Sequence, residues 1–345
     1  MKIENFKVSE GSCFIIAEIG NNHNGEMEIA KKLIDEALKC GVSAVKFQTK
    51  DIETAFPQNL LNKNYEGPNS FGKTYREHKQ VLELSIPQLK ELKEYSEKKD
   101  LIFFSTPFDI KSLNDLISLD LEIFKISSFH VTDLKLVEAV SKTKKPVIIS
   151  TGGATLTEIK RALNIFKKNK NVALLKCTVK YPANPEITNL KTIESLQKKF
   201  KKVTIGFSDH TVGTAASILA VSLGAKIIEK HFILNKKINS IDNFFSADPI
   251  EMKNLVKDCK SVKKYLGKVF YGPTKDEIPS MKHRRSIYFA KNVRKGKKLN
   301  KDYIAIVRPS HGTNLKFLKK IIGKKLDKNY QMGDKLSNNF TRVLR

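Results

Sequence analysis

Two histidines, His210 and His231, each stand just past the end of a short apolar run rich in β-branched residues, 203–207 and 226–230. In a barrel of parallel strands, side chains at the carboxyl ends of neighbouring strands lie close together. Two imidazoles brought together in this way can bind one divalent metal ion. A single histidine is more often an ordinary core or surface residue, but the matched contexts of these two favour a metal site.

Lysines and hydroxyl side chains also stand near the ends of apolar runs. Lys46 and Lys125 lie inside such runs, and a lysine is almost never buried without a partner, so we expect both ammonium groups to meet an anion. Hydroxyl residues in similar positions can add neutral donors: Ser105, Thr106, Ser128, Ser150 and Ser208. Any one of them is equally typical of a helix cap, but the set predicts a cradle for phosphate and carboxylate groups. We therefore expect a metal-assisted enzyme acting on a small phosphorylated or carboxylated substrate.

The elements that carry these residues follow a repeating pattern of strand and helix. The apolar runs are continuous rather than alternating, which is typical of parallel strands covered by helices. Eight such units in about 270 residues predict a closed (β/α)8 barrel, the TIM barrel, with an open doubly wound sheet as the alternative. The runs span 13–19, 43–47, 101–105, 122–126, 146–150, 172–177, 203–207 and 226–230, and helical segments include 27–40, 155–168 and 211–224.

The pattern changes in two places. Residues 50–87 form a long insertion rich in turn formers and aromatics; because it follows a barrel strand, we expect it to lie over the active-site face. The barrel pattern ends near Gly267, so we expect a catalytic barrel over 1–267. Residues 268–285 then contain two prolines and mixed charge, which predicts a linker, and 286–345 predict a small second domain of short strands, turns and one short helix.

The composition argues against several function classes. The net charge of +27 comes almost entirely from lysines spread along the chain, and arginine, the residue favoured for bidentate phosphate contacts, is scarce, so we expect no nucleic-acid partner. No apolar stretch of about 18 residues predicts a membrane helix, and the N-terminal region lacks a signal-peptide pattern, so we expect a cytoplasmic protein without a membrane partner. The cysteines are widely spaced, and we expect reduced core thiols at Cys13, Cys40, Cys177 and Cys259.

Nine sequence motifs, in this order along the chain, resemble those of the sialic acid synthase family, and the tail after Arg285 looks like the antifreeze-like (SAF) domain that follows the barrel there. The motifs are AEIGNNHNG (17–25), VKFQT (45–49), SFGKTYREHK (70–79), FSTPFD (104–109), FKISS (124–128), ISTGG (149–153), KCTVKYPANPE (176–186), GFSDHTVG (206–213) and GAKIIEKHF (224–232).

The resemblance implies an enzyme that condenses phosphoenolpyruvate with an open-chain N-acetylated amino sugar to give a nine-carbon 2-keto acid and phosphate. It also implies a divalent metal ion (Mn²⁺, with Mg²⁺ or Co²⁺ as alternatives) and a homodimer with a domain-swapped SAF domain. By position, His210 and His231 would bind the metal and Glu18 would lie near it. The phosphoenolpyruvate ligands would be Lys46, Thr106, Lys125, Ser128, Ser150 and Ser208, and the acceptor sugar would meet Tyr181, Asp242, Phe245 and Arg308. The groups expected to act in catalysis are Glu18, Lys46, Lys125, Tyr181, His210 and His231.

Three positions depart from the family pattern and leave the acceptor sugar open. His130 replaces the usual Glu, Val179 replaces a frequent Asn, and Phe245 stands in a stretch that is usually more polar. The last change resembles synthases of pseudaminic acid, so a pseudaminic or legionaminic acid synthase is an alternative. A related phosphoenolpyruvate-dependent keto-deoxy sugar acid synthase, a Schiff-base lysine and a non-enzymatic polyanion binder are further alternatives.

Overall fold

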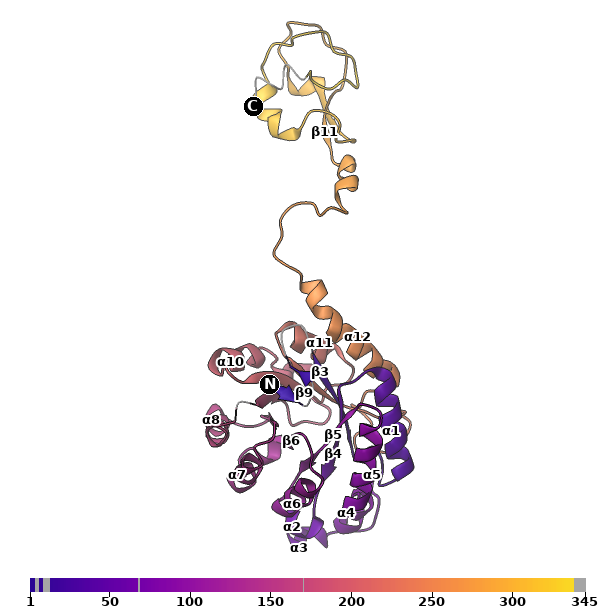
Figure 1. The fold of residues 1–345 in the computed structure, drawn as a ribbon. Coiled ribbons are helices and arrows are strands. Elements are labelled where there is room, and N and C mark those ends of the chain that lie inside the picture. Colours follow the sequence, from indigo (N-terminus) through magenta and orange to yellow (C-terminus); the bar gives the residue numbers. More distant parts are fainter. Residues whose placement is uncertain (4–5, 9–12, 68, 170, 338–345) are drawn as a thin grey trace. The chain divides into compact units, whose positions relative to one another are not determined.

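The computed structural model describes residues 1–345 except 4–5, 9–12, 68, 170 and 338–345 (Figure 1). The chain divides into two compact units, Met1–Gly267 and Lys268–Arg345. The last eight residues of the predicted second domain, 338–345, lie outside the described residues.

Eight parallel strands form the centre of the first unit, with helices around them (Figure 1). The first strand of the sheet pairs with the last, and the two end strands of the hydrogen-bonded order, β5 and β6, contact one another, so the sheet closes on itself. The predicted (β/α)8 barrel is therefore confirmed, and the alternative prediction of an open doubly wound sheet is wrong. The strands are β3 (Phe14–Gly20), β4 (Ala44–Thr49), β5 (Ile102–Pro107), β6 (Phe124–Ile126), β7 (Val147–Ser150), β8 (Val172–Cys177), β9 (Thr204–Asp209) and β10 (Ile227–His231).

Helices cover the outer face of the barrel because each presents one apolar side to the strands. In α1 (Met27–Cys40), residues at helical spacing, among them Ala30, Leu33 and Ala37, are buried, and Gly41 ends the helix in the left-handed conformation that favours glycine. The other outer helices are α5 (Ile86–Glu97), α6 (Ile110–Ser118), α7 (Leu134–Lys142), α8 (Leu156–Ile165), α10 (Thr192–Lys199), α11 (Ala215–Ser222) and α12 (Pro249–Leu266).

The barrel has two apolar layers, since successive strand residues point to opposite faces. One set of strand residues packs against the helices, and the alternate set fills the interior. A hairpin of β1 (Lys2–Ile3) and β2 (Phe6–Lys7) adds Ile3 to the interior cluster. The interior is tightly filled: a Cβ on Gly206 would lie 2.4 Å from the Ile227 carbonyl oxygen, so no other residue fits there without a shift.

The insertion after β4 folds into three short helices, α2 (Ile52–Ala55), α3 (Gln58–Leu61) and α4 (Tyr75–Leu82). A capping box between Thr74 and Glu77 starts α4. Aromatic side chains hold the segment together; for example, the rings of Tyr65 and His78 stack with centroids 4.3 Å apart.

The second unit has its own small core. Strands β11 (Ser286–Phe289) and β12 (Ile304–Val307) pair antiparallel, and the ring of Tyr330 stacks on Phe289 at 4.3 Å. The remaining elements are η2 (Ile278–His283), η3 (Lys301–Tyr303), η4 (Leu315–Phe317) and α13 (Leu318–Ile321).

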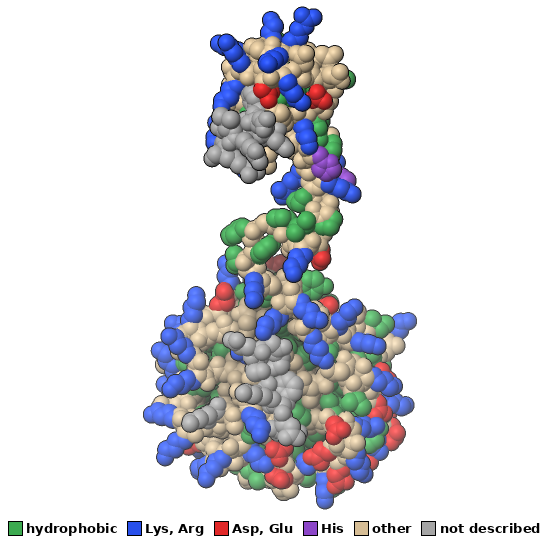
Figure 2. All heavy atoms as spheres, turned by 45° about the horizontal axis from the view of Figure 1, so that its top comes forward, with side chains coloured by type: hydrophobic (Ala, Val, Ile, Leu, Met, Phe, Trp, Pro, Cys, Tyr) green, Lys and Arg blue, Asp and Glu red, His purple; other side chains and the backbone are tan. Residues whose placement is uncertain are grey.

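The surface agrees with the lysine-rich composition. Figure 2 shows Lys and Arg side chains scattered over both units on the face drawn. No described helix is both long enough and apolar enough to cross a membrane. The four cysteines are buried free thiols, as expected.

Candidate active site

A cavity of about 580 Å³ opens at the carboxyl ends of the barrel strands. Strand alternation explains what lines it. On β3, Phe14 and Ile16 fill the interior, so Glu18 follows them on the same face at the cavity floor. The same step of two residues places Lys46 after Ala44 and Lys125 after Ile123. By this rule, further strands deliver Thr106, Ser150, Cys177, Ser208, Glu229 and His231 to the cavity.

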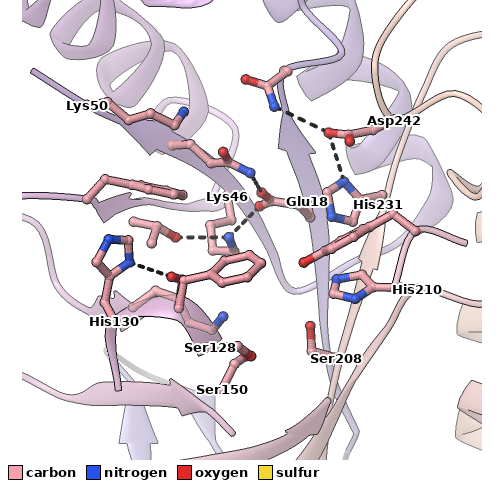
Figure 3. A pocket seen from close by; sticks show the side chains of 18 of the residues that line it. Glu18, Lys46, Lys50, Ser128, His130, Ser150, Ser208, His210, His231 and Asp242 are labelled. Carbon is pink, nitrogen blue, oxygen red and sulfur yellow. Dashed lines mark hydrogen bonds and ion pairs between the residues drawn. The ribbon is translucent and has the colours of Figure 1, made fainter. Parts of the chain in front are cut away.

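Lys46 lies in a network of buried polar groups (Figure 3). Its ammonium Nζ lies 2.6 Å from Glu18 Oε2 and donates to Thr106 Oγ1 at 3.0 Å, and Gln48 Nε2 donates to the other Glu18 oxygen at 2.8 Å. Burial disfavours the charged amine, but the neighbouring carboxylates outweigh it and raise the pKa of Lys46. This lysine therefore stays protonated at neutral pH.

Lys125 pairs with a second buried carboxylate. Its Nζ lies 3.2 Å from Glu229 Oε1, which also accepts from Ser208 Oγ at 2.9 Å. Burial lowers the pKa of Lys125, while Glu229 partly offsets this effect. Burial opposes ionisation of Glu229 too, but Lys125 and Lys46 hold its pKa below the usual range.

Two serines complete the floor between these lysines. Ser128 Oγ accepts from the backbone N–H of Gly152 at 2.9 Å. Ser150 Oγ is buried and has no hydrogen-bond partner among the described residues. A buried hydroxyl without a partner is costly, so this group is available to a ligand.

The two histidines meet on one side of the cavity, with ring centroids 5.4 Å apart. His210 Nδ1 lies 2.9 Å from the Thr178 carbonyl oxygen, and His231 Nδ1 lies 3.4 Å from Asp242 Oδ2. The carbonyl contact assigns the proton of His210 to Nδ1 and leaves its Nε2 as a metal donor, and the nearby Asp242 carboxylate favours the same tautomer in His231.

The donor set fits a divalent metal ion in its chemistry. Within the described residues, no group of three or more His, Cys, Asp and Glu side chains is arranged around a common ion position. An ion held by His210 and His231 would therefore take its remaining ligands from water or from substrate oxygens.

Aromatic rings support the histidines. Tyr181 lines the cavity, and its ring lies 4.3 Å from that of His210. Phe245 is 2% exposed and lies behind the cavity wall, 4.8 Å from the ring of His231 and 5.9 Å from that of His210. Phe245 is therefore placed to orient the imidazoles.

The opposite side of the cavity carries residues of the insertion and of nearby turns. Figure 3 shows Lys50 and His130 across the cavity from His210 and His231. Lys79 of α4 lines the same cavity together with Tyr75 and Phe108. The insertion thus contributes to the active-site face, as its position after a barrel strand predicts.

One predicted site residue belongs to the second unit. Arg308 is exposed in the second unit, directly after β12. Val179, one of the positions that depart from the family pattern, packs against the turn at Gly152 and does not line the cavity itself.

The sequence did not single out several lining residues, notably Asn21, Lys50, Lys79 and Cys177. Cys177 follows Leu175 by one strand step, a signal that strand alternation could have used. Asn21 follows β3 in a turn, and the two lysines lie in the insertion, where no periodic pattern marks them.

Comparison with known proteins agrees with this site. The family model described as "NeuB family" matches residues 33–271. N,N'-diacetyllegionaminic acid synthase of Campylobacter jejuni is 37% identical, over 92% of this chain and 96% of that protein. N-acetylneuraminate-9-phosphate synthase of Mus musculus is 36% identical, over 88% of this chain and 80% of that protein.

A solved structure of N-acetylneuraminic acid (sialic acid) synthetase from Leptospira borgpetersenii, in complex with citrate, has the same fold. It is 35% identical, has a TM-score of 0.71, and the match covers 81% of this chain and 94% of that one. With the family model matching most of the barrel and relatives matching nearly the whole chain, this protein belongs to the NeuB family.

Proposed function

We propose that this protein is a nonulosonic acid synthase. It would condense phosphoenolpyruvate with an open-chain N-acetylated amino sugar and release a nine-carbon 2-keto acid and inorganic phosphate. One observation carries the proposal: two buried lysines, Lys46 and Lys125, face the same cavity floor together with buried hydroxyls. Such a floor suits a small ligand that bears both a phosphate and a carboxylate.

In this proposal the lysines act by fixed charge. Lys46 and Lys125 bind the anionic groups of phosphoenolpyruvate, and Thr106, Ser128, Ser150 and Ser208 add neutral hydrogen bonds. A Schiff-base role is less well supported, because the raised pKa of Lys46 keeps its amine protonated and Lys125 is ion-paired.

The reaction forms one carbon–carbon bond. The C3 carbon of phosphoenolpyruvate attacks the aldehyde carbon of the sugar, and the aldehyde oxygen takes a proton from solvent water. Positive charge develops at C2, where the carboxylates of Glu18 and Glu229 lie close to the lysines. Water then adds at C2, Glu18 accepts its proton, and collapse of the tetrahedral intermediate expels phosphate and leaves the keto group.

We also propose that His210 and His231 bind a divalent ion, with Mn²⁺ favoured over Mg²⁺ and Co²⁺. When bound, such an ion supplies Lewis acidity toward the aldehyde oxygen. Asp242 and Phe245 hold the His231 ring, and Tyr181 covers that of His210. Tyr181 and Asp242 would then face the acceptor sugar.

For the rest of the molecule we propose an SAF fold for the second unit and a cytoplasmic homodimer. In that dimer the second unit of one copy would exchange with that of the other, so that Arg308 reaches the acceptor in the partner's barrel. The names of the relatives support sialic, legionaminic and pseudaminic acids as candidate products.

The test measures phosphate release from phosphoenolpyruvate with Mn²⁺, with and without a chelator. N-acetylmannosamine and the 6-deoxy diacetamido sugars serve as acceptors. Release that depends on an acceptor and is abolished by the chelator is expected. Release with none of these acceptors, nor with a phosphorylated N-acetylmannosamine, would refute the synthase function. Release that survives the chelator would refute the proposed metal dependence.

A further inference from the structure

Within the described part of the chain, Lys79 presents to the cavity an ammonium group without a direct partner, on which Glu83 and Asp242 act only at longer range. Among the described residues its ammonium group has no hydrogen-bond or ion-pair partner, and its Nζ lies 5.2 Å from the centroid of the Tyr75 ring. Burial and the nearby charge of Lys50 lower the pKa of Lys79 to about 8. An ammonium held in this way is stabilised by any anion that reaches it.

The neighbouring lysine differs in this respect. Lys50 Nζ lies 3.0 Å from Glu83 Oε1 and 4.5 Å from the centroid of the Phe108 ring. Glu83 Oε2 also accepts from the Lys50 backbone N–H at 3.0 Å, so both oxygens of this carboxylate bind Lys50. Glu83 therefore pairs directly with Lys50, and Lys79 has no direct ion-pair partner among the described residues.

His130 adds a third nitrogen-bearing side chain to this side of the cavity. Its Nδ1 shares a hydrogen bond of 2.6 Å with Ser127 Oγ, and its ring packs edge-on against Phe108. The Nε2 atom remains for a ligand. Burial lowers the pKa of His130, so its imidazole is neutral at neutral pH. The two lysines Lys50 and Lys79 and this imidazole together form a region that we call the distal subsite.

Two members of the distal subsite, Lys50 and His130, lie across the cavity from the histidine pair (Figure 3), and Lys79 lines the same cavity. If the aldehyde end of the acceptor lies at His210 and His231, as the proposed function requires, then the far end of its carbon chain points toward the distal subsite. A volume of about 580 Å³ leaves room for phosphoenolpyruvate and an extended hexose together.

We propose that the distal subsite binds a phosphate ester on the terminal carbon of the acceptor, with Lys79 as its main charged contact. This inference rests on the proposed function and specifies its substrate: the acceptor is a phosphorylated N-acetylated amino sugar. A phosphate dianion neutralises the free charge of Lys79 and offers further oxygens to His130 and Lys50.

The experiment compares N-acetylmannosamine 6-phosphate with N-acetylmannosamine as acceptors and follows the consumption of phosphoenolpyruvate. We expect the full-length enzyme to favour the phosphorylated sugar by about tenfold or more in kcat/KM. In Lys79→Met, kcat/KM should fall at least tenfold further for the phosphorylated sugar than for the other. Lys90→Met, on the exposed face of α5, is the matched control and should change neither value.

Equal use of the two sugars by the native enzyme would overturn the proposal. So would a Lys79→Met variant that loses both activities equally, or one whose main defect is a higher KM for phosphoenolpyruvate. Calorimetric titration with N-acetylmannosamine 6-phosphate alone separates this inference from the synthase function. Binding that disappears in Lys79→Met would uphold the subsite even without turnover, and absence of binding to the native protein would refute it.

Discussion

The two histidines are held by different partners, so the contribution of each to metal binding can be tested separately. His210 contacts a backbone carbonyl, which a substitution elsewhere leaves in place, whereas His231 depends on the Asp242 carboxylate. Both imidazoles are nearly buried at the edge of the cavity. A change at either position should therefore act on the bound ion more than on the fold.

We expect His210→Ala to lower Mn²⁺ affinity at least about tenfold, because one of two protein ligands is lost. The far-UV circular dichroism spectrum should stay unchanged. Metal binding is measured by equilibrium dialysis, which needs no turnover. His283→Ala, at an exposed histidine of the second unit, is the control. Native-like Mn²⁺ affinity in His210→Ala would remove His210 from the ligand set.

Lys79 also predicts a pH dependence. Its pKa is lowered to about 8, so the ammonium form is complete below that value and is lost as pH rises through it. Affinity for the phosphorylated acceptor should therefore fall from about pH 7 to about pH 9.5. The charged groups near Lys79 are Lys50, Glu83 and Asp242. Lys79→Arg keeps its charge over this range and should flatten the profile; an unaltered profile would assign the effect to another group.

At the scale of single residues, the sequence reveals the floor of the site better than its far side. Lys46 and Lys125 are conspicuous because a charged residue interrupts an apolar run. Lys79 lies in a polar, turn-rich stretch, where it cannot be told from a solvated lysine until the fold places it at the cavity. Phe245 likewise carries no sign that its ring will lie behind His231.

At the scale of elements, β9 and β10 are joined by a buried ion pair on the side that faces α11. Lys230 Nζ lies 3.4 Å from Asp209 Oδ2, and that oxygen also accepts from Ser217 Oγ at 2.6 Å. Lys230 also donates to the Thr211 carbonyl oxygen. Each member of the pair directly precedes a candidate metal ligand, so the pair fixes the two strand ends that carry them.

Lys230→Met should lower the free energy of unfolding by about 3–5 kcal/mol, because Asp209 is left buried without its counter-charge. The double variant Asp209→Asn/Lys230→Met should recover much of this loss. Urea unfolding followed by circular dichroism measures both. Lys199→Met, an exposed lysine of α10, is the control. A cost of less than about 1 kcal/mol for the single variant would show that the pair contributes little.

The apolar runs predict all eight strands to within two residues at each end. The main error in the predicted strand bounds is at their carboxyl ends, because strands such as β9 continue through polar residues there. Ser208 and Asp209 remain in the hydrogen-bonded strand although neither is apolar, because Ser208 faces the cavity and Asp209 finds Lys230. The structure of the insertion was harder to predict, because its short helices depend on aromatic contacts that hydrophobic periodicity does not reveal.

At the scale of the whole molecule, the two units have separate cores, Met1–Gly267 and Lys268–Arg345. We expect a chain ending at Gly267 to fold, with a cooperative thermal transition and native helix content, because the barrel core lies entirely within it. Differential scanning calorimetry and circular dichroism test this. A chain that is unfolded at 25 °C would show that the barrel needs the second unit for its stability.

Arg308 tests the role of the second unit in the reaction. If it reaches the acceptor in a partner's barrel, Arg308→Ala should raise KM for the acceptor about tenfold or more and change KM for phosphoenolpyruvate by less. Arg294→Ala, in the same unit, is the matched control. Mixing Arg308→Ala with a barrel variant such as His210→Ala should restore part of the activity if the site is shared between copies. An unchanged acceptor KM would argue against any such contact.

The origin of the cavity walls has an evolutionary consequence. The floor belongs to the strands, where every inward side chain is constrained by the packed interior beneath it. The far wall is built in part from residues 50–87, a segment that leaves the barrel after β4 and returns before β5. Substitutions there leave the strand residues of the floor unchanged, so under the proposed function acceptor preference can diverge while the residues that bind phosphoenolpyruvate are kept. Exchanging this one loop between family members is the most direct route to redesigned acceptor preference.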